Sequence, residues 1–382
     1  MASIDIDQLA GLVAPISEEA PTGIDLRSDD SGATALRAIK DARAKASEIE
    51  RQSHGSSLGS GGAESEEAPK SFEQALVHWR TVSSLAQRVL TERAKDLEVV
   101  AYLIEALVRI DGFAGLAIGF RLARELAENY WDNLYPAPDE DGLETRVLPL
   151  ARLNGDGSEG LLMAPIRMIR ITEGSTEGPF AIWQKKQADD LNRDKERDRE
   201  VRISRGAVTT ERISRAAAET STEFFRELLA QIQDAQQEFA TLTEVVDEKC
   251  SSQPGSAPPS SAIHDALEDA LSIVREITRG RFPDEVPVES PNGQPVAAEK
   301  TQGGTVANGL TTREDAFRVL NSVADFFESK DPHCLLAAQV RKVVRLGRMS
   351  PAEYFSELIQ DETARNELFK LVGIKPPDSE SN

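Results

Sequence analysis

Apolar residues recur every three or four positions along most of this chain, which is the spacing of one face of an α-helix. Aromatic residues make up only 5% of the chain, and this scarcity also favours helices over strands. We therefore predict an all-α, multi-domain chain, with one small β-hairpin possible at 166–183. The spacing is clearest at Leu76, Trp79, Val82, Ala86 and Val89, at Val99, Leu103, Leu107 and Ile110, and between Phe225 and Val246.

Helix breakers and changes in composition divide the 382 residues into five predicted parts. A flexible linker is expected at 280–310, which contains several Pro and Gly, and a charged connector at 186–207. A further flexible loop, rich in Gly and Ser, is predicted at 53–70. The three remaining parts are an N-terminal helical domain at 1–185, a middle helical domain at 208–279 and a C-terminal helical domain at 311–376.

Local signals predict several helix ends in the N-terminal part. Ser71, with Gln74 three residues later, has the pattern of a capping box and predicts a helix start. Asp96 predicts the start of the next helix, whose apolar face begins at Val99. A third helix is expected from about Phe113 to Tyr135, where two prolines stop it.

The charge of the chain limits its partners. The formal net charge is −21 and the pI is about 4.8, so phosphate backbones and anionic membrane surfaces would repel the protein. No apolar run approaches the roughly 18 residues of a spanning helix, and the first residues carry acids where a signal peptide carries bases. The two cysteines, Cys250 and Cys334, are too few for a disulfide framework. We expect a cytoplasmic protein that binds no nucleic acid and does not insert into a membrane.

Three loops have patterns that resemble active sites. Residues 155–160 fit G-x-G-x-x-G, but a helix is predicted before them and their two acids would repel a pyrophosphate. Residues 55–59 fit G-x-S-x-G around Ser57, but they lie in a predicted flexible loop rather than a rigid strand-to-helix turn. Residues 154–158 suggest a calcium loop, but the next position is Glu159 where that loop needs glycine.

The histidines give no further sign of an active site. No two of them show metal-ligand spacing with a cysteine or a carboxylate. We therefore expect no catalytic, cofactor-binding or metal-binding residues, and we expect that the chain is not an enzyme. The four histidines are His54, His78, His264 and His333.

Two features favour a role in protein–protein contacts. The first is a helix end with large aromatic side chains, followed by the rigid, acidic turn Pro-Ala-Pro-Asp-Glu-Asp. One interpretation is a structural corner whose rings pack inward; the other is a docking edge, because aromatic residues beside polar groups suit interfaces. The candidate partner-binding residues are Trp131, Tyr135, Asp139, Glu140 and Asp141.

The second feature is a basic, acid-free run in the C-terminal part of this acidic chain. It is either a solvated helix face or an electrostatic contact to an acidic surface such as a second copy, through acids like Glu353, Glu357 or Asp361. A three-helix domain of this size cannot bury all its apolar residues, including Phe326 and Val344, so we expect it to oligomerise. The candidate oligomerisation residues are Arg341, Lys342, Arg345, Leu346, Arg348 and Phe355.

Three blocks of the N-terminal part resemble the ImpA N-terminal domain of the TssA family of bacterial type VI secretion systems. They occur in the family's order within about residues 10–175, as LVAPISEEAPTGIDLR, KDLEVVAYLIEALVRIDGFAGL and ENYWDNLYPAPDEDGLETRVLPLARLNG. Trp131, Tyr135 and Asp139 lie in the third block. The end of the chain, from Phe326 to Ile374, is similar to the C-terminal domain of the shorter family members, although Cys334 and Leu346 replace a common serine and tryptophan.

The resemblance implies a non-enzymatic assembly protein without a cofactor. Members of this family form symmetric, ring-like homo-oligomers through the C-terminal region and contact baseplate, inner-tube and sheath proteins. The short C-terminal part favours a role at the baseplate and in tail assembly. The alternative is an accessory protein of the same superfamily that anchors or terminates the sheath, which a hydrophobic C-terminal segment would mark.

Overall fold

The computed structural model of the chain divides it into two compact units, residues 1–288 and residues 289–382, and each is described by itself. The boundary between the two units, at 288/289, lies within the linker predicted at 280–310. The assignment of five parts stays a prediction. Among the residues predicted as linker, only 280–282 are described. The structure describes residues 4–28, 30–59, 67–140, 142–174, 176–253, 255–282, 317, 319–324, 335–348 and 365.

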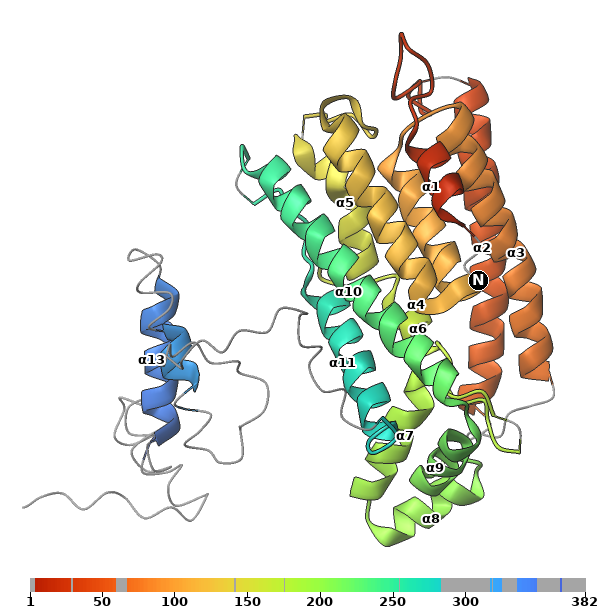
Figure 1. The fold of residues 1–382 in the computed structure, drawn as a ribbon, viewed down its shortest axis with the longest axis vertical. Coiled ribbons are helices and arrows are strands. Elements are labelled where there is room, and N and C mark those ends of the chain that lie inside the picture. Colours follow the sequence, from red (N-terminus) through yellow and green to blue (C-terminus); the bar gives the residue numbers. More distant parts are fainter. Residues whose placement is uncertain are drawn as a thin grey trace, which may run out of the picture. The chain divides into compact units, whose positions relative to one another are not determined.

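The first unit is a bundle of helices (Figure 1), so the prediction of an all-α chain is confirmed. The β-hairpin considered at 166–183 is wrong: Arg170 and Ala181 form one isolated bridge, and neither run continues as a strand in the described residues. The helices are α1 (Ile6–Val13), α2 (Asp30–Gly59), α3 (Glu67–Glu92), α4 (Leu97–Tyr130), the 3-10 turn η1 (Trp131–Asn133), α5 (Leu143–Asn154), α6 (Met163–Arg167), α7 (Ile182–Arg193), α8 (Glu196–Ser204), α9 (Thr210–Glu219), α10 (Thr222–Cys250) and α11 (Ser261–Ile277).

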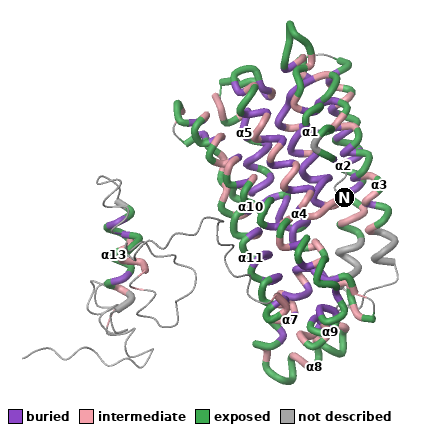
Figure 2. Tube along the Cα trace, in the orientation of Figure 1, coloured by how far each residue is buried: buried purple, intermediate pink, exposed green. Residues whose placement is uncertain are grey.

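Helix α4 is the centre of the core, and it is a hairpin of two helical halves. Asp96 caps its start by accepting hydrogen bonds from the backbone N–H groups of Glu98 and Val99, as the sequence predicts. The halves meet at Gly112, whose φ of 62° and ψ of −132° interrupt the helix. Figure 2 shows buried residues concentrated along α4.

Two glycines let the halves of α4 lie against each other. A Cβ atom on Gly115 would lie 2.2 Å from the carbonyl oxygen of Leu107, and one on Gly119 would lie 2.6 Å from the side chain of Ile104. Because 115 lies opposite 107 and 119 lies opposite 104, the two halves run antiparallel. The sequence-based expectation of one helix starting at Asp96 and another near 113 therefore matches the two halves.

The ends of two neighbouring helices differ from the prediction. Residues 53–59, predicted as loop, continue α2, and α3 begins at Glu67 rather than at Ser71. Glycine and serine lower helix propensity by only about 1 kcal/mol or less per residue, so packing against a neighbouring helix can override them. Helices α2 and α3 pack against each other, and α3 also packs against α4.

The predicted middle part packs onto the N-terminal part rather than standing apart. Helix α10 lies against α4 and α11, and its buried stripe, which includes Phe225 and Val246, joins the core built around α4. The Phe120 and Phe239 rings, one from each of α4 and α10, have their centroids 4.9 Å apart. In space, the first three predicted parts therefore form one compact unit.

Helices α7, α8 and α9 form the lower end of the bundle in Figure 1. They enclose a small second core that includes Phe180, Ala188 and Val208. The predicted charged connector, 186–207, corresponds to the end of α7 and all of α8, and α8 has no buried residue. In the second unit, helix α13 (Leu335–Arg348) carries the basic run.

Candidate partner-binding surfaces

The corner after α4 is built around a buried arginine. Arg146 of α5 is 3% exposed and donates hydrogen bonds to the carbonyl oxygens of Trp131 at 2.6 Å and Pro136 at 3.2 Å. Its guanidinium lies 5.4 Å from the centre of the Trp131 ring, and burial lowers the pKa of Arg146. Backbone hydrogen bonds join Tyr135 to the residues around the start of α4: the Tyr135 N–H donates to the Lys95 carbonyl, and the Tyr135 carbonyl accepts from the N–H of Leu97. The corner is therefore held by the Arg146 side chain from α5 and by backbone hydrogen bonds near the start of α4.

The acidic turn that follows is fixed at its base. The hydroxyl of Thr145 donates to the carboxylate of Asp139 at 2.6 Å, and the N–H of Gly142 donates to the Asp139 carbonyl at 3.0 Å. Gln253, in the loop between α10 and α11, accepts a hydrogen bond from the N–H of Leu143 at 3.1 Å. Gly142 has a φ of 73°, and a Cβ atom there would meet the Gln253 amide at 2.5 Å.

The structure separates the candidate partner-binding residues into two groups. Trp131 is only 8% exposed, so its ring packs inward as the structural-corner interpretation expects. Tyr135 is half-buried, whereas Asp139 and Glu140 are exposed. Asp141 lies outside the described residues. The accessible part of the corner is therefore acidic rather than aromatic.

A buried lysine that sequence reasoning missed ties α1 to the bundle. Lys95 is fully buried, and its Nζ donates to the carbonyl oxygens of Leu12 and Leu90, each at 2.6 Å. These oxygens lie at the C-terminal ends of α1 and α3, where helix dipoles favour a cation. Burial lowers the pKa of Lys95 to about 8.

A second charged network, also missed, joins α2, α3 and α4. Arg43 donates two hydrogen bonds to the carboxylate of Glu105, at 2.8 and 2.9 Å, and Arg109 donates two to Glu50, at 2.8 and 3.2 Å. The indole N–H of Trp79 also donates to Glu50 at 2.7 Å, and the Arg109 guanidinium lies 3.9 Å from the Trp79 ring centre. Burial raises the pKa of Glu105, and Arg43 opposes that rise. Helical periodicity alone does not reveal these pairs, because they join residues about 30 to 60 positions apart.

The loops that resemble active sites have structural roles. Gly155 ends α5 with a φ of 99°, and its N–H donates to the Ala151 carbonyl at 2.8 Å. The Asn154 side-chain oxygen accepts from the backbone N–H of Ile263 at 2.9 Å, which links this loop to α11. The glycine motif therefore follows a helix C-terminus, where exposed carbonyls disfavour phosphate. Ser57 lies within α2 rather than on a strand-to-helix turn.

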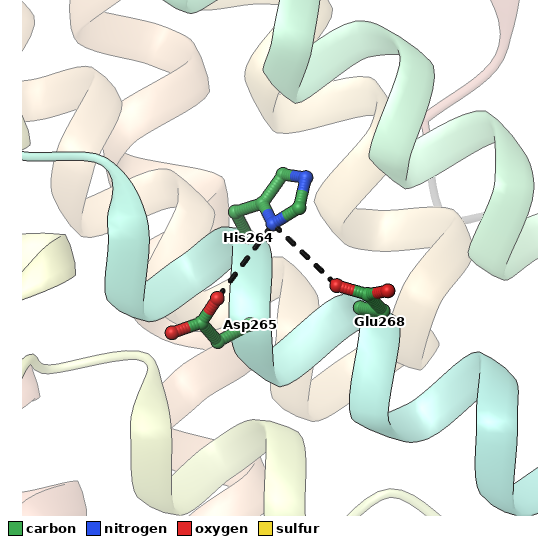
Figure 3. Close-up of side chains that lie close together, drawn as sticks. All are labelled: His264, Asp265 and Glu268. Carbon is green, nitrogen blue, oxygen red and sulfur yellow. Dashed lines mark ion pairs between the residues drawn. The ribbon is translucent and has the colours of Figure 1, made fainter. Parts of the chain in front are cut away.

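Three exposed side chains on α11 lie close enough to share a cation (Figure 3). The Nδ1 atom of His264 is 3.7 Å from an Asp265 oxygen and 4.0 Å from a Glu268 oxygen. His264 and Glu268 are four residues apart in the sequence, so the expectation that no histidine has metal-ligand spacing with a carboxylate is wrong at this position. All three belong to one solvent-exposed helix, and within the described chain no second element completes the set, so we interpret it as a surface ion-pair cluster.

Helix α13 has a buried side and an exposed side. Ala337 and Val344 are buried, so the expectation that Val344 is left over from the core is wrong. The exposed apolar residues are instead Leu336, 44% exposed, and Val343, 57% exposed. The structure places the candidate oligomerisation residues as follows: Arg341, Lys342 and Arg345 are exposed, Leu346 is half-buried, and Phe355 and the side chain of Arg348 lie outside the described residues.

Comparison with known proteins identifies the N-terminal region. The family model described as "ImpA, N-terminal, type VI secretion system" matches residues 13–155, within the range that the sequence resemblance covers. The type VI secretion system component TssA1 of Pseudomonas aeruginosa is 24% identical over 309 residues, which are 79% of this chain and 85% of that protein. No helix in the described ranges is long and apolar enough to cross a membrane.

The fold gives the same result. A solved structure of the N-terminal domain of the TssA component from Burkholderia cenocepacia, which includes the conserved ImpA_N region, has a TM-score of 0.55 and 26% sequence identity to this chain. The similarity covers 71% of this chain and 93% of that structure. The chain therefore carries an ImpA N-terminal region and is similar, over most of its length, to TssA components of type VI secretion systems.

Proposed function

We propose that this chain is a cytoplasmic, non-enzymatic assembly protein of a type VI secretion system. Its C-terminal part, 311–376, forms a ring-like homo-oligomer, and the ring organises the baseplate and the assembly of the tail tube and sheath. The observation that carries the proposal is helix α13, which combines an exposed apolar stripe with an acid-free basic face on a chain of net charge −21.

The stripe on α13 has the geometry of a helix–helix contact. Leu336, Val340 and Val343 follow the i, i+4, i+7 spacing of one helix face. Val340 is half-buried and the other two are exposed, while Val344 on the adjacent face is buried. A partner helix would cover this stripe, at roughly 25 cal/mol per Å² of apolar area removed from water.

The charge of α13 favours contact between copies. Copies that each carry a net charge of −21 repel one another, and the repulsion grows as they approach. Arg341, Lys342 and Arg345 place positive charge beside the stripe and can meet acidic residues of the next copy. Repetition of one such head-to-tail contact closes into a ring where the rotation between copies fits.

We propose that the acidic turn at Asp139, Glu140 and Asp141 docks a baseplate, inner-tube or sheath protein. The anchors described above hold the turn, so its exposed charges lose little conformational entropy on binding. A basic patch on the partner would complement them. Trp131 is buried and cannot contact a partner, and Tyr135 can contribute only its exposed portion.

The first experiment measures the mass of the full-length protein in solution by light scattering. The double variant Leu336→Glu with Val343→Glu should form particles of lower mass, because it places charge in the apolar stripe. The matched control is Val77→Glu on α3, since Val77 and Val343 are both 57% exposed. If the wild-type protein is monomeric at tens of micromolar, or if the double variant keeps the wild-type mass, α13 does not mediate assembly.

The second experiment tests docking at the acidic turn. Asp139→Lys, Glu140→Lys and Asp141→Lys together should reduce pull-down of the partner protein while the oligomer keeps its mass. Asp156→Lys, another exposed acid in a loop of the first unit, provides the control. Equal recovery of baseplate, tube and sheath proteins by the triple variant and the control would disprove docking at this turn.

A further inference from the structure

A groove on the first unit shares no lining residue with α13 or with the acidic turn. It has a volume of about 420 Å³ and lies where α1, α4 and α10 meet. Ala114, Ala117 and Ile118 of α4 line its floor, together with Ile4 and Leu9 from α1 and the residues before it. The small alanine side chains leave space between α1 and α10, and the three α4 residues are only half-buried.

The groove has the length of a short helix. Its lining on α4 extends from Ala114 to Arg121, and its lining on α10 extends from Gln231 to Glu238. Each stretch covers about two helical turns, or roughly 10 Å. An open, apolar floor of this length with polar edges is the form that binds an amphipathic helix through side chains at i, i+4 and i+7.

The edges of the groove carry excess negative charge. Arg121 is neutralised by Glu125 at 2.7 Å, and Glu238 is neutralised by Arg124 at 3.1 Å. Asp234 is exposed and has no ion-pair partner in the described part of the chain, and the exposed Asp5 carboxylate accepts only the cap hydrogen bond from the N–H of Gln8. Two carboxylates on opposite sides, from the start of α1 and from α10, therefore face an approaching ligand.

We propose that this groove binds a short amphipathic helix of another protein, with apolar residues on one face and lysine or arginine beside them. The apolar side chains would cover Ala117 and Ile118, and the basic ones would meet Asp5 and Asp234. A foreign segment is favoured over a second copy because a second copy is itself strongly acidic, and because the proposed function already uses α13 for self-association.

The test uses the full-length protein and a synthetic probe. The probe is a fluorescein-labelled helical peptide of about 14 residues with leucines at three- and four-residue spacing and lysines elsewhere. A matched peptide has glutamates in place of the lysines. We expect fluorescence anisotropy to give a Kd of about 10 μM for the lysine peptide and binding at least about tenfold weaker for the glutamate peptide.

Three variants locate the binding. Ala117→Trp fills the floor without changing charge and should weaken the lysine peptide about tenfold, with circular dichroism confirming the fold. Asp234→Lys changes an exposed edge residue and should weaken it about threefold or more. Glu244→Lys makes the same charge change at an exposed position of α10 outside the groove, and should leave the Kd unchanged.

Two results would overturn the proposal. Equal binding of the lysine peptide to wild type, Ala117→Trp and Asp234→Lys would show non-specific attraction to an acidic protein. A lower oligomer mass for Ala117→Trp would show that a second copy occupies the groove, which separates this inference from the proposed assembly through α13.

Discussion

Helix α4 buries its apolar residues and pairs its charges within the first unit, whereas α13 leaves apolar and basic side chains exposed in the second. Glu105 and Arg124 of α4 have partners on α2 and α10. On α13, Val343 remains 57% exposed although Val344 beside it is buried. The stability of the first unit therefore depends on contacts inside the chain, whereas the exposed apolar residues of α13 are the basis of the proposed contact between copies.

The largest test of this contrast removes a buried charge. Glu105→Ala removes a buried carboxylate and leaves the partly exposed Arg43 without its partner, so we expect it to lower the free energy of unfolding by about 3 kcal/mol. Glu92→Ala breaks the exposed pair with Arg88 and should cost at most about 0.5 kcal/mol. All three tryptophans lie in the first unit, so their fluorescence during denaturation reports on that unit. Equal losses in the two variants would contradict the contrast.

The next test uses the pH dependence of Lys95. Its pKa is about 8 in the folded protein against an ordinary value of 10.5, so the unfolded state binds more protons between these values. Stability should therefore rise with pH across this window, because the cost of burying the charge disappears as Lys95 loses its proton. The wild-type minus Lys95→Met difference in unfolding free energy should increase by roughly 2–3 kcal/mol from about pH 7.5 to about pH 10.

Subtracting the unfolding free energy of Lys95→Met from that of the wild type cancels the contributions of all groups that titrate in both proteins. Lys95→Met keeps a similar side-chain volume while removing the titrating amine, so only the contribution of Lys95 remains. A difference that stays constant over this pH range would show that the amine keeps its ordinary pKa when folded.

A smaller loss of stability is expected where the halves of α4 touch. Gly115→Ala places a methyl group 2.2 Å from the backbone oxygen of Leu107, so the halves must separate. We expect a loss of about 2 kcal/mol in thermal or chemical denaturation. Gly11→Ala in α1 meets nothing within 4 Å and should be neutral or slightly stabilising. Stability of Gly115→Ala equal to that of Gly11→Ala would disprove the close contact.

Local sequence signals predicted those features of the fold that depend only on residues close together in the sequence. The cap at Asp96 and the break before Phe113 were found because a cap and a glycine interruption act within one turn. The start of α3 at Glu67 was missed because packing against α2 outweighs weak local propensity. The pairing of α10 with α4, and the burial of Lys95, depend on long-range contacts that periodicity cannot assign.

In the candidate surfaces too, local features could be predicted from the sequence, and features that depend on long-range contacts could not. The acidity of the turn at Asp139 was visible in the sequence, but the burial of Trp131 depends on Arg146, which comes from the next helix. The basic run of α13 was also visible, while Val344, which was expected to be left over from the core, is buried. Val343 and Val344 are chemically identical neighbours, and only the surroundings of the helix decide which one is covered.

The smallest effect on stability is expected from the basic side chains of α13. Arg341→Glu with Arg345→Glu changes exposed residues and should alter the unfolding free energy by no more than about 0.5 kcal/mol. Its effect should appear in assembly instead. Because exposed charge pairs are screened over about 10 Å at 0.1 M salt, the wild-type particle should lose mass as salt rises.

The double variant should already be smaller at low salt and should respond weakly to added salt, since the attraction that salt screens is missing. Arg88→Glu with Arg193→Glu reverses two exposed arginines of the first unit and therefore lowers the net charge by the same amount. Light scattering at several salt concentrations distinguishes the cases. If the control shrinks as much as the α13 variant, total charge rather than the basic face of α13 limits assembly. If neither shrinks, the basic run is a solvated face and the apolar stripe acts alone.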